Sequence, residues 1–324
     1  MKNLVIFLIL LCALWMVGVL FEDKQENDYK FMSVQHTNIC RAIAAIIIII
    51  IIIIQHVSGG FEIRYLTPLG GIGVAMFLIL SGYGLNESYK KKKSGGYWKK
   101  KVVRVLIPYL IVSMVVIGLQ ILCSFKIEIP YYWYLDFILF WYLVFYLIIS
   151  IPGMYAKRYW ILSVTSIMVF IACTMAGSGL RAEQALSFLI GIWISDNYES
   201  AREVLTNKGI LFTLVITGGV LLMTKQIPII RIQGDTVLWQ GIQLGMKVSF
   251  AMALIGFIYC FRRIFNSGFI ALVSKISYEL YLVHFRLLRL PQKGVMGMCS
   301  FLGLSIIGAW VVNKISSYIK KRIC

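Results

Sequence analysis

The sequence predicts an all-α fold, a polytopic bundle of transmembrane helices with about ten core spans and one extra hydrophobic helix at the N-terminus. Of the 324 residues, 60% are hydrophobic and only 14% are charged, whereas a soluble domain carries about 25% charged residues. The mean hydropathy is +0.83. Apolar runs of about twenty residues, long enough to cross a bilayer as a helix, recur along the chain. Since the alternation typical of a membrane β-barrel is absent, the backbone in lipid must form its hydrogen bonds within helices.

Eleven hydrophobic segments are the candidates for these helices. In chain order they are residues 4–21, 42–57, 66–86, 105–125, 134–151, 159–176, 182–195, 209–223, 245–261, 269–289 and 295–313. The loops between them are short, so we expect no separately folded soluble domain. We divide the chain into residues 1–37, a hydrophobic segment followed by an acidic loop, and residues 38–324, the membrane domain.

The basic residues between the segments predict the orientation in the bilayer. Residues Lys90 to Arg104 contain eight Lys or Arg, the largest concentration in the chain, and basic loops tend to stay in the cytoplasm. Alternation from there places the C-terminus in the cytoplasm as well. The net charge of +18 is therefore explained by topology, and we expect the lipid bilayer, not nucleic acid, as the partner.

The first hydrophobic segment does not follow this pattern, because it would place Met1 and Lys2 on the outer side. Three explanations remain open. The short tail is translocated, the segment is a signal-like extension, or the native chain starts at Met32.

Few side chains in this apolar chain can carry chemistry. The three histidines are His36 in the hydrophilic loop before the second segment, His56 at the end of an isoleucine-rich segment, and His284 within a later segment. A polar side chain at membrane depth is costly and is therefore a functional candidate. The alternatives are an interfacial position for His56 and a packing hydrogen bond for His284. The seven cysteines are scattered without a CxxC pair, which indicates neither a disulfide framework nor a metal site.

Four stretches, taken in their order and spacing, resemble the membrane acyltransferase 3 family. They are Arg41–Ala45 running on to His56, Gly70–Tyr83, Lys99–Tyr109 and Ile276–His284, with Trp141-Tyr142 as a weaker fifth. The resemblance implies that residues 38–324 form a membrane acyltransferase domain. Its expected activity is transfer of an acyl group, typically acetyl, from acyl-coenzyme A to a hydroxyl of a cell-surface or lipid-linked carbohydrate. The implied location is the bacterial cytoplasmic membrane.

The resemblance assigns catalytic roles to His56 and Arg41, and donor-binding roles to Arg41, Lys101 and Arg104. Histidine is the natural base for removing a hydroxyl proton, and basic side chains bind the phosphates of coenzyme A. Lys101 stands where the family has Arg, which keeps the charge but loses the planar fork. No metal is implied. The expected substrate-binding or supporting residues are Ser81, Tyr83, Trp141, Tyr278 and His284.

The chain departs from the family pattern at the nine consecutive isoleucines, Ile46–Ile54. Four more residues separate Arg41 from His56 than the family pattern has, which adds about 6 Å of helix and about 40° of rotation. His56 would stay on roughly the same helix face but be lifted away from Arg41. Two other functions therefore remain open: a transporter or flippase-like protein, and a membrane partner whose catalytic site has decayed.

Overall fold

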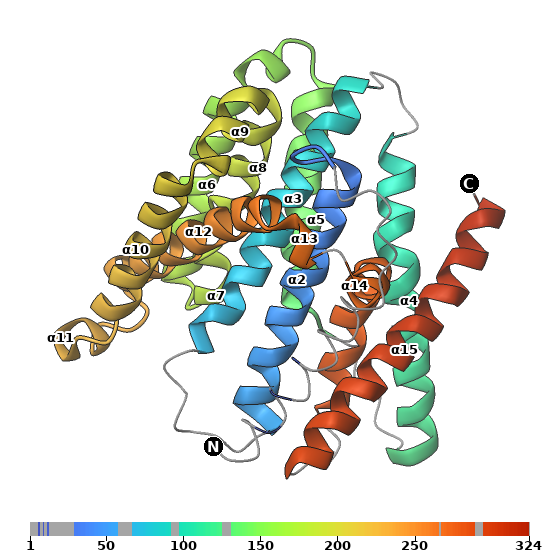
Figure 1. Ribbon diagram of the computed structural model, residues 1–324. Coiled ribbons are helices and arrows are strands. Elements are labelled where there is room, and N and C mark those ends of the chain that lie inside the picture. The colour runs from blue at the N-terminus through green and yellow to red at the C-terminus, as the bar shows by residue number, and fades with distance from the viewer. Residues whose placement is uncertain are drawn as a thin grey trace.

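The computed structural model of the protein is a bundle of helices, with no strand among the residues that it describes (Figure 1). Apart from the single positions Ile6, Ile9 and Cys12, these are residues 29–57, 67–91, 97–124, 131–265, 267–288 and 294–323. The predicted extra N-terminal helix at 4–21 lies outside the described residues except at those positions.

The main helices follow one another along nearly the whole described chain. They are α2 (Val34–Ile52) with the π-helical turn η1 (Ile53–Val57), α3 (Gly70–Lys91), α4 (Tyr97–Ser124), α5 (Trp133–Ser150), α6 (Arg158–Met175), α8 (Ser187–Asp196), α9 (Tyr198–Thr206), α10 (Lys208–Thr224), α12 (Val237–Cys260), α14 (Gly268–Leu287) and α15 (Gly294–Ile323). The remaining elements are short: η3 (Met154–Lys157), α7 (Gly179–Ala182), α11 (Pro228–Arg231) and α13 (Arg262–Phe265).

The prediction of a helical membrane bundle is confirmed. Seven described helices are long and apolar enough to cross a membrane, or eight if α9 and α10, bent by 76° at their junction, count as one broken span. The predicted number of ten is not confirmed by the helices of the described residues. The segment expected at 182–195 contains only the ten-residue helix α8, and ten residues rise only about 15 Å, half of a hydrocarbon core.

Helix α3 lies at the centre of the bundle, between α2 and α8 (Figure 1). Two glycines allow α3 and α8 to approach closely. A Cβ atom at Gly82 would collide with the carbonyl oxygen of Phe188, and one at Gly191 would collide with the carbonyl oxygen of Ile79. Small residues at such crossings are typical of membrane helices, where association depends on close packing.

The isoleucine run is helical, as predicted, and forms the second half of α2 together with the start of η1. Its side chains pack against α3, α14 and α15. The helix then widens into the π-helical turn Ile53–Val57, a local irregularity that is rare and often found at functional sites.

His36 does not lie in a hydrophilic loop, so that prediction is wrong. It belongs to the first turn of α2 and is fully buried. Its Nδ1 accepts the backbone N–H of Met32 at 2.9 Å, and its Nε2 donates to the carbonyl of Ile255 at 3.1 Å. The rings of Tyr29 and Phe31 pack against it. Because both ring nitrogens are paired inside the core, His36 has a structural role that its polar sequence neighbourhood did not reveal.

One lysine lies in the middle of a span and is paired there. Lys247 of α12 is buried and forms an ion pair with Glu183, which follows α7. Gly71 at the start of α3 leaves room for the lysine, because a Cβ atom there would collide with the lysine side chain. The pair compensates two charges that would be costly if either were buried alone.

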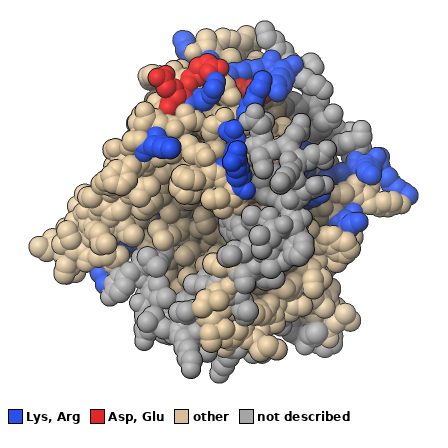
Figure 2. Space-filling view, viewed as in Figure 1, with Lys and Arg blue, Asp and Glu red and all other residues tan. Residues whose placement is uncertain are grey.

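Charged side chains are concentrated at one end of the face shown in Figure 2. Figure 2 shows Lys, Arg, Asp and Glu concentrated at the upper end of the visible face, with a further group of basic residues at its right edge and mostly uncharged atoms elsewhere. At the upper end α3 finishes with Lys90 and Lys91. We refer to this as the basic end of the molecule.

Candidate functional site

A cavity of about 430 Å³ lies between α2, α3, α4, α5, α14 and α15. Four of the residues expected from the sequence line it: Arg41, Ser81, Arg104 and Tyr278. Each of them comes from a different one of the four stretches that resemble the family, so the fold brings distant segments to one place. The cavity wall mixes polar and apolar groups, which is typical of a ligand site.

Arg41 reaches the cavity from α2 and Arg104 reaches it from α4. The Nη1 of Arg41 donates to Oδ1 of Asn38 at 3.1 Å, and the two guanidinium groups are close enough to repel each other. Pro108 lies inside α4, one turn beyond Arg104. Because proline has no N–H, the carbonyl of Arg104 receives no helical hydrogen bond from that position.

Two further cations line the same cavity, Lys275 of α14 and Lys320 of α15. The sequence contained a signal for each of them. Lys275 directly precedes the stretch Ile276–His284, and Lys320 belongs to the basic C-terminal group. Sequence reasoning used the C-terminal basic residues only as markers of topology and did not consider Lys275, so both residues were missed.

The cations of the cavity form no close ion pair among the described residues, although Glu279 attracts Lys320 from a greater distance. No carboxylate oxygen of that part of the chain lies within 4.0 Å of a side-chain nitrogen of Arg41, Arg104, Lys275 or Lys320. Glu279 also lines the cavity, but its Oε1 accepts a hydrogen bond from Asn313 at 3.1 Å.

The aromatic wall of the cavity joins the helices around it. Tyr134 and Tyr142 of α5 line the cavity together with Ser81 of α3. The hydroxyl of Tyr278 donates to the carbonyl of Val105 at 2.9 Å, which ties α14 to α4. Tyr278 therefore has a structural contact in addition to its place in the wall.

Two of the expected supporting residues do not line this cavity. Trp141 is fully buried and its ring stacks on that of Phe188, with 5.4 Å between centroids and 13° between planes. Tyr83 is half-buried and packs against the core. For Trp141 and Tyr83 the structure shows packing contacts. The side chain of Lys101 lies outside the described residues.

His56 lies apart from the cavity. It belongs to η1, its side chain is exposed, and it is not among the cavity-lining residues. His56 is fifteen positions after Arg41 in the chain, which corresponds to a helical rise of about 22 Å. The chain that follows, residues 58–66, lies outside the described residues.

His284 is buried close to the cavity. It lines a small void of about 10 Å³, large enough for about one water molecule, and this void shares Ile48, Phe77, Ser277 and Tyr281 with the large cavity. Its Nδ1 donates to the carbonyl of Leu280 at 2.8 Å. That bond assigns the proton of the neutral ring to Nδ1 and leaves Nε2 as the basic nitrogen.

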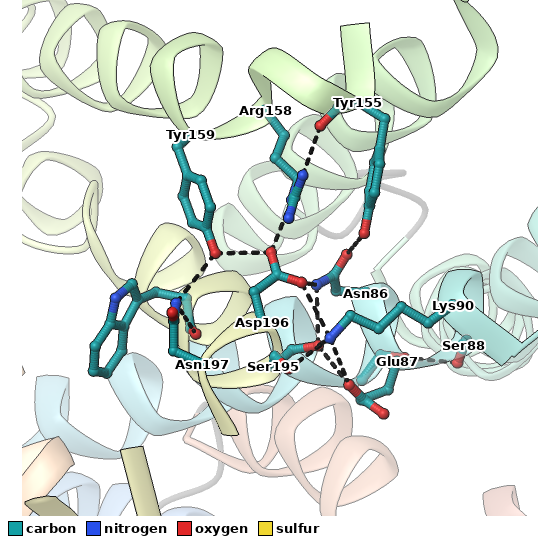
Figure 3. A network of polar contacts seen from close by, with 12 residues as sticks. Asn86, Glu87, Ser88, Lys90, Tyr155, Arg158, Tyr159, Ser195, Asp196 and Asn197 are labelled. Atoms are coloured by element: carbon teal, nitrogen blue, oxygen red, sulfur yellow. Dashed lines mark hydrogen bonds and ion pairs between the residues drawn. The ribbon is translucent and has the colours of Figure 1, made fainter. Parts of the chain in front are cut away.

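The basic end also contains a network in which charges are matched (Figure 3). The carboxylate of Asp196 at the end of α8 accepts from Arg158 Nε at 2.8 Å and from the Tyr159 hydroxyl at 2.8 Å. Lys90 lies 3.1 Å from both Asp196 and Glu87. Lys90, part of the basic stretch expected to lie in the cytoplasm, is thus paired with carboxylates and links α3 to α8.

This matching shifts the titration of the network. Burial alone would raise the pKa of the Asp196 carboxyl, but hydrogen bonds from Arg158, Tyr159, Lys90 and Asn86 together hold that pKa below its ordinary value. The Nδ2 of Asn86 donates to Asp196 at 2.7 Å. The network therefore keeps a negative charge where three helices meet.

Among the described residues, no three His, Cys, Asp or Glu side chains lie close enough together to hold a metal ion. The arrangement of the remaining groups is that of a polytopic helical membrane protein with a cation-lined cavity between its helices. A family model described as an acyltransferase domain matches residues 37–314, nearly the whole chain, and the chain belongs to this acyltransferase 3 family. The resemblance seen in the sequence is confirmed, and the protein is a membrane acyltransferase by family. Comparison with curated proteins and with solved structures gives no match.

Proposed function

We propose that the protein transfers an acyl group, typically acetyl, from acyl-coenzyme A to a hydroxyl of a cell-surface or lipid-linked carbohydrate. The observation that supports this donor is the cavity itself, because its cations lack carboxylate partners among the described residues. Cations gathered in a partly enclosed space repel one another, and an anionic ligand relieves that repulsion. Coenzyme A supplies a pyrophosphate and a phosphate monoester.

In this proposal the pyrophosphate lies against Arg41 and Arg104, since guanidinium groups form paired hydrogen bonds with phosphate oxygens. Lys101 adds charge from the turn before Arg104. The basic end faces the cytoplasm of a bacterial cell, in line with the tendency of basic loops to remain inside. The donor then enters from the compartment in which coenzyme A thioesters are made, and the acyl group is directed into the bundle.

The chemical step is attack of a carbohydrate hydroxyl on the thioester. The hydroxyl oxygen bonds to the acyl carbon as the carbon–sulfur bond breaks, and the hydroxyl proton passes to an imidazole and then to the departing thiolate. We assign this imidazole to His56, which lies at the opposite end of α2 from Arg41 and is exposed to an acceptor arriving there. Ser81 and Tyr278 support the donor side, and His284 supports the acceptor path.

The test uses the purified protein in lipid nanodiscs, with acetyl-coenzyme A and a membrane glycan fraction. His56→Ala should lower acetyl transfer by about 100- to 10,000-fold, the usual contribution of a general base, while binding of acetyl-coenzyme A stays unchanged. The exposed neighbour in the same π-helical turn, Gln55→Ala, is the matched control. If His56→Ala leaves acetyl transfer unchanged and His284→Gln abolishes it, the general base is His284 and not His56.

One observation favours a transporter instead, the 76° bend between α9 and α10. Interrupted helices of this kind often surround the substrate site of a transporter. Turnover separates the two functions. A transporter, or a partner with a decayed site, would bind acetyl-coenzyme A without releasing free coenzyme A, whereas the proposed enzyme releases one thiol for each acetyl ester formed.

A further inference from the structure

We propose that Lys275 and Lys320 form a second anion-binding subsite in the cavity, which holds the 3′-phosphate monoester of the donor and makes the protein selective for complete coenzyme A thioesters. This inference rests on the proposed acyl-coenzyme A donor. It adds the residues that distinguish coenzyme A from donors that lack the monoester.

The first observation is that the cavity gathers four cations from four helices. Arg104 is close enough to repel both Arg41 and Lys320, and Glu279 acts on Lys320 in the opposite, attractive sense. The arginines come from α2 and α4, whereas Lys275 and Lys320 come from α14 and α15. Four cations beside one carboxylate offer more positive charge than one pyrophosphate needs.

The second observation is that the lysine side of the cavity is held in place. The Nδ2 of Asn313 in α15 donates to the backbone carbonyl of Lys275 at 3.0 Å and to Oε1 of Glu279 at 3.1 Å. Asn313 therefore joins α14 to α15 where their lysines meet the cavity, and its amide occupies the Glu279 oxygen. No carboxylate oxygen of the described residues lies within 4.0 Å of either lysine amine, although Glu279 attracts Lys320 from a greater distance.

The third observation is the hydroxyl group beside them. Ser317 lines the cavity one turn before Lys320 on the same helix, and side chains three residues apart share a helix face. A phosphate monoester carries about −1.5 to −2 charges near neutral pH and three acceptor oxygens. Two ammonium groups and a hydroxyl fit that group, whereas the paired oxygens of a pyrophosphate suit the forked guanidinium groups of the other subsite.

The experiment compares binding of acetyl-coenzyme A and acetyl-3′-dephospho-coenzyme A by isothermal titration calorimetry. The protein is held in nanodiscs of phosphatidylcholine only, so that no anionic lipid can occupy the subsite. The variants are Lys320→Ala and the double variant Lys275→Ala/Lys320→Ala. The matched control is Lys314→Ala on the same helix, whose amine lies over the ring of Trp310 at 5.2 Å and does not line the cavity.

The unmodified protein should bind acetyl-coenzyme A about tenfold more tightly than the dephospho compound, as expected for charge-assisted hydrogen bonds. Lys320→Ala and the double variant should lose this preference through weaker binding of acetyl-coenzyme A alone, and Lys314→Ala should retain it. Unchanged binding of the dephospho compound shows that the variants are folded.

Two results would overturn the subsite. One is equal affinity of the unmodified protein for the two donors, which would leave the proposed function intact. The other is an equal loss of affinity for both donors in the lysine variants. Failure of the unmodified protein to bind either donor would instead remove the proposed function, and the subsite with it. If the protein prefers acetyl-coenzyme A to the dephospho compound only when anionic lipid is added to the nanodiscs, the lysines bind a lipid headgroup and the 3′-phosphate subsite is rejected.

Discussion

Two groups of cations lie along α3, and they differ in what surrounds them. Lys90 and Arg158 lie in the network of Figure 3, where Asp196 and Glu87 neutralise them. The cavity group, a few residues earlier along α3 where Gly84 lines the wall, has no such partners among the described residues. The sequence assigned Arg41 and Arg104 to the donor through the family pattern, but it did not show which basic residues are paired with carboxylates.

The difference distinguishes cations that stabilise the fold from cations that are available to bind a ligand. A cation with a buried carboxylate partner stabilises the contact between two helices, and removal of either partner leaves an uncompensated charge. A cation without a partner contributes little to packing and repels its neighbours, so it is available to an anion. Substitutions in the two groups should therefore have opposite consequences for stability and for donor binding.

The largest expected effect is that of Arg41→Gln. Loss of its hydrogen bonds to phosphate should weaken binding of acetyl-coenzyme A by about ten- to a hundredfold, the magnitude of charge-assisted bonds. The melting temperature should stay the same or rise, because repulsion with Arg104 is removed. Calorimetry and thermal unfolding in detergent measure the two quantities. Arg202→Gln is the control, since Arg202 is exposed, forms an ion pair with the exposed Glu199 and does not line the cavity. Normal donor binding by Arg41→Gln would contradict the distinction between the cavity cations and the cations of the Asp196 network.

Asp196→Asn should lower the stability of the protein and leave its donor affinity unchanged. The carboxylate loses its charge while Lys90 and Arg158 keep theirs, which should destabilise the protein by about 3 kcal/mol, the cost of breaking a buried pair. Donor affinity of the remaining folded protein should be unchanged. Thermal unfolding and calorimetry on the same sample test this. A stable variant with weakened donor binding would show that the network belongs to the ligand site.

A smaller effect on the melting temperature is expected when the pH is lowered. The pKa of Asp196 is lowered in the folded protein, so its contribution to stability is complete above the ordinary aspartate value of 3.8 and is lost as the pH falls through the lower folded pKa. The melting temperature of the unmodified protein should therefore fall toward that of Asp196→Asn below about pH 4. Arg41→Gln should follow the acid dependence of the unmodified protein. A constant difference between the unmodified protein and Asp196→Asn from pH 7 to pH 3 would contradict the assignment.

Several candidate residues could be predicted because motif and helix geometry are local. Arg41 precedes the apolar isoleucine run on the same helix, and Ser81 lies in a glycine-rich helix, so their places in the bundle follow from helical periodicity and family pattern. Arg104 and Tyr278 line the same cavity for the same reason. The isoleucine run was also predicted to be helical, since a backbone in lipid has no other way to satisfy its hydrogen bonds.

Other features could not be predicted, because they depend on contacts between distant parts of the chain. His36 looked like a loop residue, yet its ring is held by the carbonyl of Ile255 on α12. The register of His56 was expected to survive one extra helical turn, but the helix widens at Ile53 and the side chain is exposed outside the cavity. Helical periodicity could not foresee a π-helical turn.

The sequence by itself determined that this protein is an all-α membrane bundle of the acyltransferase family. Composition decides that question, because an apolar chain in lipid has only helices available to it and the family pattern is carried by consecutive residues. Only the tertiary structure decided which cations are neutralised and which remain for a ligand. Charge pairing depends on distance in space, and the carboxylate that neutralises Lys90 comes from α8, far along the chain.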